Sequence, residues 1–351
     1  MKRVVCAVAL VVVGARTAHA DDDEDVSTAR RVGAIAAAIV PGAILHGAGA
    51  FVLGERRTAK HLLEMEAVGL AALAIGAALI QGSRGSAYTV EPGVPILIAG
   101  AALVLPSWFD DIWVAAGGPR ARGGAIAASA WSLELGTTFM HDAYRVRGLV
   151  RAGATIDVGR VGFAAGTYLD SEGASRTGDL EGHYVIAGDH SHGAHRNVAD
   201  GSRLVARAAV RYHRDDPDNV TTDTVEAEVT GRLELKHLDD ALAGTFAEVS
   251  TGFGIGRTAY STGAHDNDTL LLGRFAWGMY LGSRGEATIF YDHRRDGLAG
   301  GFDAWRGAGF VGSFGAGANV LVGGPWAARA EVQFGNAVVT TFALQYRGDA
   351  P

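Results

Sequence analysis

The chain has 351 residues, enough for one large domain or two ordinary ones, and its formal net charge is −7 with 20% charged residues. This balance excludes the strongly basic surface expected of a nucleic-acid-binding protein. The 50 glycines, only 8 prolines and 48% hydrophobic residues, without a G-x-y period, exclude collagen and extended disorder.

The first 20 residues are predicted to be a signal peptide. Two basic residues precede an apolar stretch, Val4–Gly14, and Ala18-His19-Ala20 has the small-x-small pattern of a cleavage site. An uncleaved anchor helix is the alternative, but the stretch is shorter than the roughly 20 residues that a span needs. We expect export, with an acidic leader over residues 21–31. The single cysteine, Cys6, lies inside this signal, so no thiol chemistry is expected of the exported chain.

Residues 32–118 form a hydrophobic region with little alternation, and we expect about three helices there. The apolar stretches are Val32–Gly54, Leu62–Gly82 and Val94–Gly117. Each is long enough to cross a hydrocarbon core as a helix, and each is rich in alanine and glycine, which let helix backbones approach closely. The pattern favours packed helical hairpins, and a helical plug in a large soluble domain is the alternative.

A few ionisable residues interrupt this apolar region. His46 lies within the first stretch and could pair with Glu64 or Glu66 of the next. Ionisable groups at membrane depth are costly, so a proton-linked or metal-binding pocket is one hypothesis. The sequence favours another, in which His46 makes a structural hydrogen bond and the acids, including Asp110 and Asp111, lie near helix ends in water.

After a predicted linker over residues 119–130, the pattern changes to alternation, which predicts strands. The clearest strand is Thr224–Lys236, where Val225, Val229 and Leu233 share one face and charged side chains occupy the other. About twelve such segments start near residues 131, 144, 160, 181, 203, 223, 243, 269, 284, 304, 325 and 337. Short turns are expected at 158–160, 282–285 and 323–325, and long polar loops near 171–180, 258–268 and 294–303.

The face that meets water decides between two kinds of barrel. A soluble lipocalin-like barrel turns its apolar face inward, whereas a membrane barrel turns it toward lipid. Lysine, common on soluble surfaces, occurs in the strand region only at Lys236, and the apolar face has many residues too small to fill a dry core. Aromatic residues near strand ends suit interface girdles. They are Trp131, Tyr168, Trp305, Trp326 and Tyr346. These features favour the membrane barrel.

Residues 131–347 resemble the outer-membrane β-barrel superfamily of Gram-negative bacteria. The last predicted strand, Val338-x-Thr340-x-Phe342-x-Leu344-x-Tyr346, is similar to the C-terminal signal of such proteins. The resemblance implies an all-β transmembrane antiparallel up-and-down barrel over residues 131–351 in the outer membrane. It also implies the lipid bilayer and the outer-membrane assembly machinery as partners. It implies no particular activity, because the superfamily is broad.

In such a barrel the charged face would line the lumen. The candidate lumen residues are Arg145, Arg147, Arg151, Arg207, Arg211, Glu226, Glu228, Arg232, Glu234, Arg274, Glu286, Arg329 and Glu331. They would set ion selectivity in an open pore, or form a paired, water-filled structural network in a closed barrel. Four histidines crowd one segment at spacings that suit a metal ion, but the surrounding glycines favour a solvated loop. They are His183, His190, His192 and His195.

These patterns favour a non-enzymatic outer-membrane protein, structural or a narrow passive channel for small ions or polar solutes, with no cofactor. Neither a G-x-S-x-G elbow nor an H-E-x-x-H motif occurs. Two alternatives remain. One is a periplasmic barrel on an inner-membrane anchor that binds an apolar ligand, and the other is a lipid-modifying enzyme on the barrel wall.

Overall fold

A computed structural model describes residues 27–82, 87–118, 124–125, 129–142, 145–189, 200–216, 219–293, 298 and 312–348. The described residues form two compact units. The helical unit contains those before residue 124 together with Glu234–Phe246, and the barrel unit contains Gly124–Leu233 and the residues from Ala247 onward. The predicted signal peptide and most of the predicted linker lie outside the described residues.

The helical unit differs from the prediction in its first part. The stretch Val32–Gly54 is not one helix, because Pro41 lacks the N–H that helix continuation requires and Gly47 adopts a left-handed φ of 91°. It forms two short helices joined by a 3-10 turn, too short to span a bilayer. The helices of the unit are α2 (Thr28–Ile39), η2 (Pro41–Ala43), α3 (Ala48–Leu53), α4 (Arg56–Gly82) and α5 (Ala87–Ala116).

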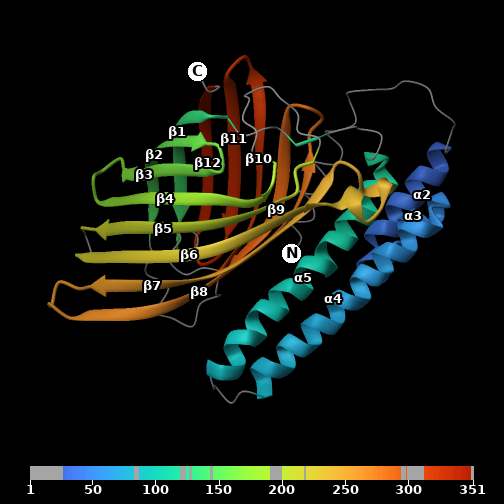
Figure 1. Ribbon diagram of the computed structural model, residues 1–351, viewed down its shortest axis with the longest axis horizontal. Helices are drawn as coiled ribbons and strands as arrows, with labels where there is room; N and C mark the ends of the chain where they lie inside the picture. The colour runs from blue at the N-terminus through green and yellow to red at the C-terminus, as the bar shows by residue number, and fades with distance from the viewer. Residues whose placement is uncertain are drawn as a thin grey trace. The chain divides into compact units, whose positions relative to one another are not determined.

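Helices α4 and α5 lie side by side (Figure 1). Glycines line the contact between them, as the alanine- and glycine-rich composition anticipates. A Cβ added to Gly76 would lie 2.7 Å from the backbone nitrogen of Leu97, and one added to Gly69 would lie 2.9 Å from the carbonyl oxygen of Gly100. Two segments in this pair, Arg56–Gly82 and Pro92–Ala116, are long and apolar enough to cross a membrane. Small residues at such a seam are typical of helices that associate in lipid.

The barrel unit confirms the predicted architecture of twelve antiparallel strands. Each strand pairs with its neighbours in sequence, and β12 pairs with β1 to close the barrel (Figure 1). The strands are β1 (Trp131–His141), β2 (Val146–Val158), β3 (Val161–Asp170), β4 (Ser175–Gly188), β5 (Arg203–Asp215), β6 (Val220–Glu234), β7 (Thr245–Ala259), β8 (His265–Tyr280), β9 (Gly285–His293), β10 (Ser313–Gly323), β11 (Trp326–Phe334) and β12 (Val338–Gly348).

We call the rim of the barrel where β1 begins and β12 ends the terminal rim, and the opposite one the distal rim.

The connections between strands correct part of the predicted loop pattern. The expected long loop near 171–180 is a tight turn, because β4 begins at Ser175, and β7 and β8 extend through most of the expected loop at 258–268. Strand β6 also ends at Glu234 and not at the predicted Lys236, because a 3-10 helix (Leu235–His237) follows it directly.

The two faces of the wall are those of a membrane barrel. Val229 and Leu233 each keep 42% of their surface exposed, whereas Glu226 on the same strand keeps 2%. Exposed apolar side chains outside and buried polar ones inside are the reverse of a lipocalin-like barrel, and only lipid makes that arrangement favourable. On β8, Phe275, Trp277 and Met279 depart from this pattern, because they are buried.

The aromatic residues divide between rim and lumen. Trp131 and Trp326 both contact the ring of Tyr346, at centroid distances of 5.6 and 5.0 Å, at the terminal rim. Tyr168, which the sequence suggested for an interface girdle, instead lines the lumen with the guanidinium of Arg151 4.8 Å from its ring. Trp305 lies outside the described residues.

Candidate functional site

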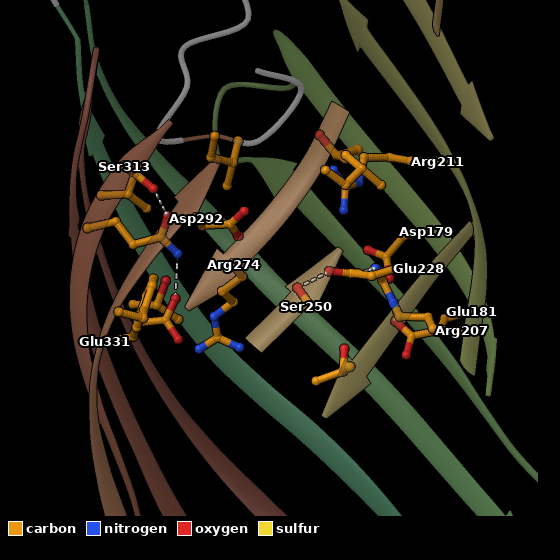
Figure 2. A pocket seen from close by; sticks show the side chains of 18 of the residues that line it. Asp179, Glu181, Arg207, Arg211, Glu228, Ser250, Arg274, Asp292, Ser313 and Glu331 are labelled. Carbon is orange, nitrogen blue, oxygen red and sulfur yellow. Dashed lines mark hydrogen bonds and ion pairs between the residues drawn. The ribbon is translucent and has the colours of Figure 1, made fainter. Parts of the chain in front are cut away.

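The barrel encloses a cavity of about 460 Å³ whose wall is strongly charged (Figure 2). Its charged lining comprises six carboxylates and five guanidinium groups, because inward positions on neighbouring strands carry acids and arginines in alternation. These groups are Asp179, Glu181, Glu228, Glu248, Asp292, Glu331, Arg151, Arg207, Arg211, Arg274 and Arg329. Only a hydrated interior accommodates this many charges without a large desolvation cost.

One network spans β1, β2, β11 and β12. Glu134 accepts hydrogen bonds from Arg151 and from the amide of Gln345, the latter at 2.6 Å, and lies 3.8 Å from Arg329. Arg329 in turn binds Glu331 at 2.8 Å. Each charge therefore has an opposite neighbour, and the chain fixes the side chains against the wall.

A second network spans β4, β5, β6 and β7. Arg207 contacts Glu181 at 2.7 Å, Glu228 at 2.8 Å and Glu226 at 3.5 Å. The hydroxyl of Ser250 donates to Glu228. Figure 2 shows Arg207, Glu181 and Glu228 on one side of the cavity and Arg274, Asp292 and Glu331 on the other. Opposed walls of mixed charge surround the space between them.

Two ion pairs cross part of the interior instead of following the wall. Arg232 on β6 contacts Glu286 on β9 at 2.8 Å, although β7 and β8 lie between these strands. With a strand spacing of about 4.8 Å, the path along the wall is about 14 Å, so the side chains reach across the lumen. Near the distal rim, Arg147 on β2 likewise reaches Asp215 on β5 at 2.8 Å. These two cross-lumen pairs lie near opposite rims of the barrel.

The structure places the remaining predicted lumen residues as follows. Arg211 lies 3.7 Å from Glu226, and Arg274 contacts Glu248 at 3.0 Å. Arg145, in the turn before β2, lies 3.6 Å from Asp215. Glu234 ends β6 within the helical unit, where it pairs with Lys236.

Sequence reasoning missed several acids that complete these networks, above all Glu134, Glu248, Asp215 and Glu181. Glu248, for example, forms ion pairs with two arginines, Arg232 and Arg274, each at 3.0 Å. The signal was present for Glu134, because it alternates with Leu133 and Leu135 in the sequence. Assigning an inward face to every strand, and not only to those with several charges, would have found it.

The proposed histidine metal site is described only in part. His183 on β4 contacts Asp157 on β2 at 3.0 Å, whereas His190, His192 and His195 lie outside the described residues. Among the residues that the structure does describe, no group of three or more potential metal ligands occurs.

In the helical unit, His46 pairs with Glu66 and not with Glu64. The His46 backbone N–H donates to Glu66 at 3.0 Å, and the two side chains lie 3.8 Å apart. Glu64 is exposed beside Lys60 at 3.5 Å. Asp111 is fully buried and accepts backbone hydrogen bonds at the start of α3. Asp110 is also fully buried, so the expectation that the acids lie in water is wrong for Glu66, Asp110 and Asp111.

The polar cluster around His46 has the residue types of a catalytic triad but not its geometry. His46 Nδ1 lies 2.6 Å from Ser107 Oγ, which donates its own hydrogen to the carbonyl of Val104. The histidine must therefore donate to the serine, the reverse of the arrangement that activates a nucleophile. Burial also lowers the pKa of His46 from its usual range, although nearby Glu66 opposes this shift. We interpret the cluster as structural.

Comparison with known proteins assigns no family to this chain. The sequence matches no protein-family model and no curated protein. Among solved structures, the KdgM porin in complex with disordered oligogalacturonate is 7% identical, with 61% of this chain and 98% of that chain covered and a TM-score of 0.40.

Two further structures have the same kind of similarity. The outer membrane protein Omp33 of Acinetobacter baumannii is 8% identical over 62% of this chain and 98% of that chain, with a TM-score of 0.33. The translocator domain of the autotransporter NalP from Neisseria meningitidis is 11% identical over 63% and 89%, with a TM-score of 0.37. Such likeness carries no argument about activity.

The fold itself defines the class. A closed, up-and-down antiparallel barrel with an apolar exterior and a charged interior is the form in which strands cross the outer membrane. The described residues thus form a β-barrel of the transmembrane kind and a separate helical unit.

Proposed function

We propose that the barrel is a narrow passive channel for small polar solutes and ions. The charged cavity of about 460 Å³ inside the closed wall is the observation that carries this proposal. Carboxylates and guanidinium groups on facing walls can replace part of the hydration shell of a passing solute, as the lining of a selective pore must. The ion-pair networks hold these groups in fixed positions, so the lining does not have to rearrange for each passing solute.

The lining also gives the channel a weak preference for cations. Six carboxylates face five guanidinium groups around the cavity. Because the excess is one negative charge and most groups are paired, the field inside is small and salt screens it further. We therefore expect discrimination by charge to be modest and discrimination by size, at the cross-lumen pairs, to be stronger.

Conductance of the full-length exported chain in planar bilayers tests the proposal. We expect small, voltage-independent steps and, in a potassium chloride gradient, a reversal potential slightly toward that of potassium. Glu228→Gln should move the reversal potential toward chloride and Arg329→Gln should move it toward potassium. Glu64→Gln, on the exposed surface of α4, is the control and should leave it unchanged.

The competing function is a closed scaffold in which the ion pairs are purely structural. The cross-lumen contacts Arg232–Glu286 and Arg147–Asp215 favour that reading, since each spans three strand spacings. Absence of any ion current at low and high voltage, from protein shown to be inserted and folded, would reject the channel and leave the scaffold.

A further inference from the structure

Two arginines face each other on the outer surface of the barrel at the distal rim. Arg176, at the start of β4, is the register partner of Arg214, near the end of β5. Both alternate with buried neighbours, because Ser175, Thr177 and His213 face the interior. The two guanidinium groups therefore project outward from directly opposed positions. Like charges placed this way destabilise a sheet unless an anion lies between them.

An arginine pair inside the barrel shows how the chain itself solves this problem. Arg203 on β5 is the register partner of Arg232 on β6, again one arginine opposite another. Here Glu248 and Glu286 bind Arg232, and both also lie within electrostatic range of Arg203. The chain thus supplies two carboxylates to an inward pair of arginines.

The outward pair has an anion at only one of its two arginines. Arg214 binds Asp216 in the following turn and also interacts with the side chain of Tyr212. Because its guanidinium group has five N–H donors, it can still bind a further acceptor. Among the described residues, no side chain bonds the guanidinium of Arg176, which is exposed. On the neighbouring strand β6, the outward acid Asp223 is the register partner of Tyr212 and not of either arginine.

The surface just below the pair suits an acyl chain. One step toward the centre of the barrel, Gly178 is opposite Tyr212, and beyond them Leu180 is opposite Val210. Leu180 is 61% exposed and Val210 48% exposed. A phenol beside arginines above an apolar band is the composition expected where hydrocarbon meets head groups.

The charge distribution places this site at one membrane interface. Along β4 to β7, the outward positions carry charged side chains only toward the distal rim, at Arg176, Arg214, Asp223 and Arg257. The terminal rim instead carries the ring cluster of Trp131, Trp326 and Tyr346. The two rims therefore meet different chemical surroundings.

From these observations we propose that Arg176 and Arg214 bind the phosphate of a membrane lipid head group in the leaflet at the distal rim. Two adjacent guanidinium forks match the oxygens of a phosphate monoester, and the acyl chain follows Leu180 and Val210. Phosphate would supply an anionic partner to Arg176 and a second one, beside Asp216, to Arg214. The site lies on the outer surface and does not depend on an open lumen.

Native mass spectrometry of the full-length exported chain in detergent tests the proposal with defined probes. Phosphatidic acid should bind wild type at least about tenfold more tightly than diacylglycerol with the same acyl chains, because only the former has the phosphate. The double variant Arg176→Gln/Arg214→Gln should lose that difference. Arg257→Gln, an outward arginine of β7, is the matched control and should retain it. Asp223→Asn should bind as tightly as wild type or more tightly.

Each contrary outcome is distinct. Equal binding by wild type and the double variant would reject the site, and an equal loss in Arg257→Gln would show unspecific attraction to a basic rim. Inorganic phosphate that competes at the same concentration as the lipid would show that the ligand is the free anion. If the double variant does not fold, Arg176→Lys/Arg214→Lys keeps the charge but removes the forks, and undiminished binding there would equally overturn the proposal.

Discussion

The barrel and the helical unit both turn apolar side chains outward and polar ones inward, but they differ in their relation to water. In the barrel, arginines and acids surround a cavity and remain partly accessible. In the helical unit, Ser107 and Asp111 are completely buried and His46 nearly so. Charges next to water can lose a partner and be hydrated, whereas sealed ones cannot.

The largest effect is expected from placing a charge on the outer face of the barrel. Val229→Arg puts a guanidinium against hydrocarbon near the middle of β6, at a cost of about 2–4 kcal/mol in the free energy of unfolding. Thr230→Arg, the next residue, faces the cavity and should cost much less. Denaturant unfolding in lipid vesicles measures both. Equal losses would contradict the assignment of the two faces.

A somewhat smaller effect is expected from opening the sealed cluster of the helical unit. Asp111 accepts the backbone N–H groups of Gly49 at 3.0 Å and Ala50 at 2.8 Å, which begin α3. Asp111→Ala leaves both buried donors unsatisfied and should destabilise α3 locally by about 2–3 kcal/mol.

Amide hydrogen exchange over Ala48–Leu53 reports this change directly. Glu64→Ala, which removes an acid from an exposed pair, is the matched control and should change protection by less than about 1 kcal/mol. Unaltered protection in Asp111→Ala would mean that this carboxylate does not hold α3.

The smallest effect concerns glycines of α4 at and beyond its contact with α5. Replacing them by alanine should lower the free energy of unfolding at one position and raise it at the other. Gly76→Ala should destabilise the pair by about 1–2 kcal/mol, because the new Cβ would meet the backbone of α5 at 2.7 Å. Gly82→Ala, with nothing within 4 Å, should stabilise α4 by up to about 1 kcal/mol. Thermal unfolding of both variants checks the contrast, and a loss of stability in both would argue against a close seam.

The fold of the barrel followed from period-two alternation, which a strand imposes directly. Strand β6 could be predicted almost to its ends, because Val225, Val229 and Leu233 contrast with charged neighbours. Strand β4 was predicted to begin too late. Its inward residues Ser175 and Thr177 are polar and its outward Arg176 is charged, so near the rim both faces of the strand look like a loop. Alternation disappears where membrane ends and head groups begin.

The candidate site was harder to predict, because its contacts join strands that are distant in sequence. The charged residues of β6 indicated a lumen, but no local pattern pairs Arg232 with Glu286 across two intervening strands. Glu66 and Asp111 looked like acids near helix ends because the sequence does not show which helix packs over them. Local chemistry predicts faces, while partners depend on tertiary packing.

The pairing of β1 with β12 also affects the kinetics of folding. These strands are the first and last of the barrel, and Thr138 and Thr341 share a hydrogen bond of 2.9 Å across the join. Until β12 pairs with β1, the incomplete sheet has two unpaired edge strands, with which other chains can pair and aggregate. Folding must therefore wait for the contact of greatest sequence separation, which makes it slow and exposes the unfinished chain to misassembly. Loss of one strand at either end would leave a curved sheet and not a smaller barrel.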